Sequence, residues 1–319
     1  MTDAALNHVH PGIDPAKFRD PDTTADGSVR ASVALNRLAT LWFNTGTLCN
    51  LECANCYIES SPSNDRLVYL TAAEVGRFLD EAEARGGTAE IGFTGGEPFM
   101  NPDFIVMLRD ALSRGYRVLV LTNAMRPMMK CADGLLALRQ EFGDRLRLRV
   151  SIDHYAARLH ELERGAHAWE RMLPGLDWLG ANGFHLSVAG RTMWQETEAQ
   201  LRAGFARLFT ERRIGIDAQD PERLVLFPEM DGSADVPEIT TACWGILNVS
   251  PDAMMCATSR MVVKRKGEPA ATVVPCTLLP YDERFDLGET LEQASADVPL
   301  NHPHCARFCV LGGGSCSVG

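Results

Sequence analysis

The sequence predicts a mixed α/β protein in which a partial (β/α)6 barrel precedes a small, cysteine-rich C-terminal domain. Short β-rich runs alternate with helical patterns from residue 39 to about residue 227. Strands joined through helices are expected to run parallel, because right-handed crossovers place the helices outside the sheet. After about residue 235 the long helical patterns stop, and Cys, Pro, Gly and short β-like runs replace them. This change of pattern predicts the second domain.

The first strand–helix unit has the clearest boundaries. Residues 39–45, ATLWFNT, predict the strand. The helix is expected to begin after Thr71, because Glu74 three residues later can complete a capping box. It is expected to end at Gly86 and Gly87. Its apolar residues repeat at the spacing of one helical face: Val75, Phe78, Leu79 and Ala82.

The following units are predicted in the same way. Residues 89–96 form a strand that ends in glycines, and a helix opens at Pro102 and closes at Gly115. The remaining expected elements are strands at 116–124, 146–153 and 184–190, helices at 168–182 and 196–210, and a weaker strand at 213–217 or 223–227. In TIM-like barrels the chemistry sits at the carboxyl ends of the strands, so functional residues are expected there.

The composition is that of a globular protein of 319 residues, of which 45% are hydrophobic. A net charge of −11 argues against a surface for nucleic acid or anionic lipid, so neither nucleic acid nor a membrane is expected as a partner. No run approaches the ~18 apolar residues of a membrane span, and the N-terminus lacks a secretory signal pattern. A cytoplasmic location and a small-molecule or peptide substrate are therefore predicted.

Three regions follow from these patterns. Residues 1–35 are rich in Asp, Pro, Thr and His without apolar periodicity, which predicts a tail or a loosely packed lead-in. Residues 36–235 are expected to form the barrel, and residues 236–319 the C-terminal domain. In a reducing cytoplasm the ten cysteines are not expected to form disulfides, so clustered cysteines are first considered as metal ligands.

Three cysteines lie in the loop that directly follows the first strand: Cys49, Cys53 and Cys56. Their short spacings do not allow disulfides among them, and the loop lacks the second Cys/His pair of a structural zinc site. Three thiolates suit a cubane iron–sulfur cluster that normally takes four ligands, which leaves one iron with an open position. The loop is therefore predicted to hold a cluster that can bind and activate a ligand at that iron.

The pattern Cys-x3-Cys-x2-Cys just after the first barrel strand resembles the radical S-adenosylmethionine (radical SAM) enzymes. The resemblance implies that Cys49, Cys53 and Cys56 hold a 4Fe-4S cluster, whose open iron is chelated by the amino and carboxylate groups of SAM. It also implies an external electron donor of the flavodoxin or ferredoxin type, and a 5'-deoxyadenosyl radical that abstracts hydrogen from the substrate. One residue departs from the family, which usually has an aromatic residue or His before the third cysteine; here it is Asn55, with Tyr57 after that cysteine.

A second pattern, FTGGEP, stands at the end of the second strand. Two glycines allow a backbone to come close to a ligand, and the adjacent carboxylate can hold an ammonium group. Taken alone, the segment can equally be a turn before a helix. Because it follows the cysteine loop by one strand–helix unit, it resembles the radical SAM motif for the amino group of SAM, which maps onto Gly95, Gly96, Glu97 and Pro98.

Residues at the ends of later strands resemble further SAM contacts of the family. Asn123 falls where the family often contacts SAM, and Arg191 where it contacts the carboxylate. Ser151 and Asp153 fall where the family contacts the ribose. Each of these residues can equally be a turn former or a helix cap.

Six more cysteines lie in the C-terminal region: Cys243, Cys256, Cys276, Cys305, Cys309 and Cys316. Their order resembles the auxiliary-cluster extensions of radical SAM enzymes, called SPASM and, in the shorter form, twitch. Cys256, Cys276, Cys305 and Cys309 best match the shorter form, and Cys243 or Cys316 can replace one of them. The resemblance implies one auxiliary 4Fe-4S cluster, and the alternative is a structural zinc site. The basic run 260–266 is expected on a solvated hairpin edge.

Together these patterns predict a radical SAM enzyme, either oxidoreductase-like or peptide-modifying, with a C-terminal auxiliary-cluster domain. Hydrogen is expected to be taken from a small-molecule or peptide substrate between the two domains, with oxidation, rearrangement or a cross-link as the outcome. The alternative is a non-catalytic iron–sulfur or zinc protein used for electron transfer or structure. The FTGGEP segment favours the enzyme, because an electron carrier needs no SAM pocket.

Overall fold

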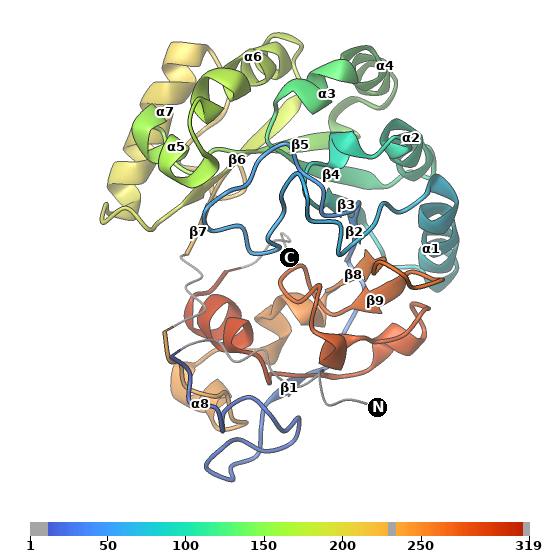
Figure 1. Cartoon of the computed structure of the whole chain (residues 1–319), viewed down its shortest axis with the longest axis vertical. Helices are drawn as coiled ribbons and strands as arrows, with labels where there is room; N and C mark the ends of the chain where they lie inside the picture. The colour runs from blue at the N-terminus through green and yellow to red at the C-terminus, as the bar shows by residue number, and fades with distance from the viewer. Residues whose placement is uncertain (1–11, 229–233, 315–319) are drawn as a thin grey trace.

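The computed structural model describes residues 12–228 and 234–314 (Figure 1). Within these residues the largest unit is one eight-stranded sheet. Its strands are β2 (Thr40–Asn44), β3 (Glu90–Thr94), β4 (Arg117–Thr122), β5 (Leu146–Ser151), β6 (His185–Arg191), β7 (Leu224–Phe227), β8 (Ser259–Val263) and β9 (Thr272–Val274). They follow the order β7-β6-β5-β4-β3-β2-β8-β9 across the sheet.

This sheet confirms the predicted fold class. Neighbouring strands from β7 to β8 run parallel, and β9 pairs antiparallel with β8. The sheet curves as a partial barrel and stays open in the described residues, because β7 and β9 are its two edges. The strand expected at 213–217 or 223–227 is found at the second position, where Leu224–Phe227 pairs with β6.

The helices between the strands lie on the outer face of the sheet (Figure 1). They are α1 (Ala72–Arg85), α2 (Phe104–Ser113), α3 (Arg126–Lys130), α4 (Ala132–Phe142), α5 (Ala157–Arg164), α6 (Ala168–Ala181) and α7 (Glu198–Arg212). The start of α1 is as predicted, because the side chains and backbone nitrogens of Thr71 and Glu74 form a capping box. In the part of the chain that the structure describes, no helix has the length and apolar character needed to cross a bilayer.

Successive side chains of a strand point to opposite faces of the sheet, so the sheet has two hydrophobic cores, one on each face. On the outer face Phe43 and Phe93 stack with their ring centroids 5.5 Å apart, and Phe104 of α2 packs edge-on against Phe93. On the inner face Trp42 lies against Gly92, where a Cβ would come within 2.3 Å of the indole. The inner core continues into apolar residues of the C-terminal region, so the two regions share buried surface.

The C-terminal region also completes the sheet, because β8 pairs with β2 along its length. The expectation of a solvated hairpin edge at 260–266 is therefore wrong for its first residues, since β8 lies buried between β2 and β9. Arg260 is 0% exposed, and its guanidinium donates to the carbonyl oxygens of Cys256 and Ala294. Backbone carbonyls thus replace the water that a basic side chain usually requires. The domain boundary at about residue 235 stays a prediction.

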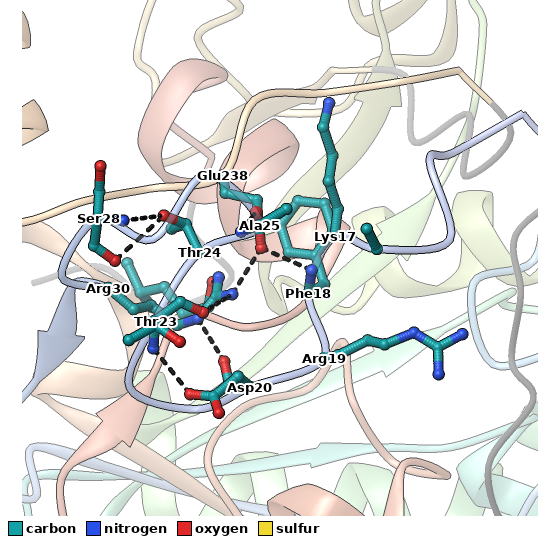
Figure 2. Close-up of polar contacts among 12 residues, drawn as sticks. Lys17, Phe18, Arg19, Asp20, Thr23, Thr24, Ala25, Ser28, Arg30 and Glu238 are labelled. Carbon is teal, nitrogen blue, oxygen red and sulfur yellow. Dashed lines mark hydrogen bonds and ion pairs between the residues drawn. The ribbon is translucent and has the colours of Figure 1, made fainter.

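The N-terminal segment packs against the C-terminal region through Glu238 (Figure 2). The carboxylate of Glu238 accepts hydrogen bonds from the backbone nitrogens of Phe18 and Ala25, each at 2.6 Å. It also accepts one from Nη2 of Arg30 at 2.5 Å. The side chains of Arg30 and Glu238 are 0% and 6% exposed, so this ion pair is buried. One carboxylate therefore holds two points of the N-terminal loop and the arginine that follows it.

The next residues of this segment form a strand, β1 (Ser32–Val33), which pairs antiparallel with β10 (Val298–Pro299). The expectation of a tail or loosely packed lead-in is therefore wrong for the described residues up to 35. The prediction depended on local composition, whereas the contacts that order the segment come from Glu238 and β10, far along the chain.

Candidate active site

A cavity of about 170 Å³ lies at the carboxyl ends of the parallel strands. The three cysteines of the loop after β2 all line it: Cys49, Cys53 and Cys56. Apolar side chains from β4, β7 and the C-terminal region complete its wall: Leu121, Phe227, Leu278 and Phe308. The cavity therefore lies between the barrel and the C-terminal region.

The three loop cysteines are buried or half-buried. Burial raises the pKa of the Cys49 thiol to about 12, and burial also raises the pKa of Cys53. A buried thiol keeps its proton unless a cation replaces it, so these residues suit metal ligation better than free nucleophilic chemistry. Among the described residues, however, no group of three or more His, Cys, Asp or Glu is arranged closely enough to hold a metal ion. The three thiols match the predicted cluster in the chemistry of their donor atoms, and their assignment as its ligands stays a prediction.

The two glycines of FTGGEP face the backbone that leads into the cysteine loop. A Cβ on Gly95 would lie 2.5 Å from the carbonyl oxygen of Gly46, and one on Gly96 would lie 2.2 Å from that of Leu48. Gly95 also has φ of +144°, which L side chains rarely adopt. Both glycines line the cavity, but the close approach that requires them is to the chain itself. Because they lack side chains, these two glycines allow the cysteine loop to pack closely against the end of β3.

Glu97, which directly follows these two glycines, is buried, with 1% of its surface exposed. Its carboxylate accepts hydrogen bonds from Oγ1 of Thr122 and the backbone nitrogen of Asn123, each at 2.9 Å. Burial raises the pKa of Glu97 to about 7 in spite of these donors. Glu97 and Pro98 are not among the described residues that line the cavity. In this structure Glu97 joins the end of β3 to the end of β4, and its contact with SAM stays a prediction.

Asn123 and Ser151 both line the cavity, as expected from their places at strand ends. Nδ2 of Asn123 donates to Oδ1 of Asn50 at 3.0 Å and lies 3.9 Å from Sγ of Cys49. Asn123 therefore ties the cysteine loop to β4 while it faces the cavity. Their predicted contacts with SAM are compatible with these positions.

Asp153 and Arg191 also line the cavity and are joined by an ion pair, with Nε of Arg191 at 3.3 Å from Oδ1 of Asp153. Arg164, at the end of α5, donates from Nε to Oδ2 of Asp153 at 2.6 Å. Burial alone would raise the pKa of Asp153, but Arg164 and Arg191 together hold it below its usual value. The carboxylate is therefore charged and already occupied by two guanidiniums.

Sequence reasoning missed Arg164 and Tyr281. Arg164 lies in an ordinary basic helix end, where such residues are common because they complement the helix dipole. Tyr281 donates from its hydroxyl to the carbonyl oxygen of Ile58 at 2.6 Å, which joins the C-terminal region to the end of the cysteine loop. No local pattern marks either residue, because both act through partners in other elements.

The C-terminal cysteines share one core. Cys256, Cys276 and Cys305 are buried in it, and Cys243 and Cys309 pack against it. Burial raises the pKa of Cys256 to about 11 and that of Cys305 well above its usual value. Negative charge on Cys276 or Cys256 would raise the pKa of Cys305 further. Cys316 lies outside the described residues.

The fold and this site define a class of enzyme, and the chain belongs to the radical SAM superfamily, whose family model matches residues 43–203. The chain is 33% identical over 141 residues to the AdoMet-dependent heme synthase of Methanosarcina barkeri, a match that covers 44% of this chain and 38% of that protein. It is 27% identical over 154 residues to the antilisterial bacteriocin subtilosin biosynthesis protein AlbA of Bacillus subtilis, covering 46% of this chain and 32% of that protein. Each match spans less than half of the relative.

Solved structures share the fold. SuiB of Streptococcus suis, bound to its precursor peptide SuiA, superposes with a TM-score of 0.60 at 13% identity, covering 82% of this chain and 66% of that one. At this identity the likeness concerns the fold alone. Membership of the superfamily implies a 4Fe-4S cluster and SAM as cofactors.

Proposed function

We propose that this protein cleaves SAM reductively at a cluster held by Cys49, Cys53 and Cys56, and abstracts hydrogen from a substrate in the adjoining cavity. The observation that carries the proposal is that all three cysteines line one cavity with residues from the ends of β4, β5 and β6. Three thiolates on a four-iron cluster leave one iron for SAM. When bound, the cluster supplies an electron that splits SAM into methionine and a 5'-deoxyadenosyl radical.

The chain's own residues prepare this site. Gly95 and Gly96 seat the cysteine loop, and Asn123 ties it to β4. Glu97 is proposed to hold the amino group of SAM, which requires its carboxylate to be charged and to reach the cavity that it does not line in this structure. Arg191 lines the cavity where a carboxylate of SAM is expected. The apolar wall from the C-terminal region keeps water away from a reactive radical.

The second part of the proposal concerns the C-terminal cysteines. Cys256, Cys276, Cys305 and Cys309 are proposed to hold one auxiliary 4Fe-4S cluster, with Cys243 or Cys316 as replacements for one of them. Their shared core supports this assignment, because it brings these thiols into one buried region of the fold. The buried guanidinium of Arg260 adds support, since it places positive charge beside Cys256 and would favour an anionic centre. A structural zinc site is the alternative.

A peptide is the proposed substrate, with a small molecule as the competitor. One relative is named for bacteriocin biosynthesis, and a structure with the same fold contains a precursor peptide. The heme synthase relative supports the competitor. The electron is proposed to come from an external flavodoxin or ferredoxin in the cytoplasm.

The test is anaerobic reconstitution followed by dithionite and SAM. Release of 5'-deoxyadenosine is expected from the wild type and from Cys131→Ala, whose thiol lies outside both cysteine groups. Cys53→Ala is expected to release none. Iron and sulfide of about eight each per chain would indicate two four-iron clusters, and about four plus zinc would overturn the auxiliary assignment. No release from fully loaded protein would favour a non-catalytic iron–sulfur or zinc protein.

A further inference from the structure

The two residues between Cys53 and Cys56 are both held by one residue of α5. The backbone nitrogen of Ala54 donates to the carbonyl oxygen of Glu163 at 2.8 Å. Nδ2 of Asn55 donates to Oε1 of Glu163 at 2.7 Å. The middle of the cysteine loop is therefore fastened from outside the cavity.

Arg191 holds the same loop from β6. Its Nη2 donates to the carbonyl oxygen of Asn55 at 2.7 Å, and its Nη1 lies 3.8 Å from Oε2 of Glu163. Its Nε pairs with Asp153, which in turn binds Arg164. We call Asp153, Glu163, Arg164 and Arg191 the loop clamp. It contains two carboxylates and two guanidiniums, so its charges balance.

Burial restricts movement of the loop clamp. The side chains of Glu163 and Asp153 are 4% and 6% exposed, and those of Arg164 and Arg191 are 12% and 18% exposed. A buried carboxylate is tolerated only while its donors stay in place, so the clamp resists displacement of Asn55. The structure describes all members of the loop clamp, and Glu163 is the one that does not line the cavity. Any effect of Glu163 on the site therefore passes through the loop or through Arg191, which lines the cavity.

We propose that Glu163 is a positioning residue for Cys53 and Cys56, which orders their loop before any metal is bound. The inference rests on the proposed function for what the two thiols hold, but the clamp is a property of the unloaded chain. A loop that is ordered in advance loses less conformational entropy when the cluster binds. The clamp also accounts for Asn55, whose amide supplies the donor that the buried carboxylate of Glu163 needs.

The first test measures amide hydrogen exchange in the loop peptide around residues 50–58 of the unloaded, full-length protein. Asn55→Ala and Glu163→Ala are each expected to speed exchange there by about tenfold, because each removes a hydrogen bond to a charged group. Glu163→Gln keeps an oxygen acceptor for Asn55, so its exchange rate in the loop peptide is expected to stay within about threefold of that of the wild type. Glu170→Ala, at an exposed position of α6, is the matched control and is expected to change nothing. Asn55 is exposed, so its variant tests the clamp even where Glu163→Ala fails to fold.

The second test compares the reconstituted proteins by electron paramagnetic resonance of the reduced cluster, before and after SAM is added. Asn55→Ala is expected to bind less iron and to give a broadened signal, while Glu163→Gln keeps the wild-type spectrum. Equal loop exchange in Asn55→Ala, Glu163→Ala and Glu170→Ala would overturn the clamp, and so would a Glu163→Gln that behaves like Glu163→Ala. A wild type that releases no 5'-deoxyadenosine would refute the proposed function but leave the exchange result standing.

Discussion

The substitution Gly96→Ala tests how closely the FTGGEP segment packs on the cysteine loop. The added Cβ would lie 2.2 Å from the carbonyl oxygen of Leu48, and backbone atoms cannot rotate away as a flexible side chain can. To restore even 3.0 Å, the two backbones must separate by about 0.8 Å. This movement would stretch two hydrogen bonds, from Gly96 N to Gly46 O at 2.8 Å and from Glu97 N to Leu48 O at 3.1 Å.

The expected cost follows from these contacts. Overpacking costs about 1–3 kcal/mol, and two weakened hydrogen bonds add about 1 kcal/mol each, so the free energy of unfolding should fall by about 3–5 kcal/mol. The matched control is Gly76→Ala in α1, where the nearest atom to the new Cβ is 3.5 Å away. In that helical position alanine is expected to stabilise the protein by up to about 1 kcal/mol.

The assay is urea unfolding of the unloaded proteins, followed by SAM cleavage after reconstitution. Gly96→Ala is expected to lower both the unfolding midpoint and the release of 5'-deoxyadenosine, while Gly76→Ala lowers neither. A Gly96→Ala protein with wild-type stability and wild-type cleavage would refute the close backbone packing at this position.

Further predictions concern stability and the cysteine loop. The folded pKa of Glu97, about 7, is above the ordinary value of 4.5, so its contribution is full below about pH 4.5 and is lost as the pH rises through 7. The free energy of unfolding of Glu97→Gln, measured with urea, should therefore rise relative to that of the wild type by up to about 3 kcal/mol between pH 4.5 and pH 8. A difference that stays constant with pH would contradict the raised pKa of this carboxylate. Arg164→Leu should lower the free energy of unfolding by about 1.5–3 kcal/mol, because the buried Asp153 keeps only the guanidinium of Arg191. Asp153→Asn in the same protein should restore part of the loss, and additive losses would exclude the coupling of Arg164 and Asp153. Tyr281→Phe should cost about 1 kcal/mol and speed hydrogen exchange near Ile58, whereas unchanged exchange would mean that the hydroxyl does not hold the loop.

Much of the barrel could be predicted because its signals are local. The capping box at Thr71 and Glu74 and the apolar face of α1 involve residues within one element, so their spacing is sufficient evidence. The cysteine loop was placed at the active end of the barrel for the same reason, since it directly follows β2. Parallel pairing then followed from the alternation of strands and helices.

The predictions that failed concern segments whose order depends on distant partners. The N-terminal lead-in is composed of polar residues, and its packing comes from Glu238 and β10. The basic run that begins at Arg260 has the composition of a solvated edge, and its burial depends on pairing with β2 and on carbonyl acceptors from residues around 295. Neither partner is visible in the local pattern.

The sequence by itself determined the class of fold and the three thiols after the first strand, because strand–helix alternation and cysteine spacing are short-range properties. Only the tertiary structure decided what holds the loop that carries those thiols. Gly96 leaves room for the backbone of the cysteine loop, and Glu97 accepts a hydrogen bond from the end of β4. Asn55 donates a hydrogen bond to Glu163 of α5. These contacts depend on the distances between separate elements, which packing sets and which no spacing along one segment records.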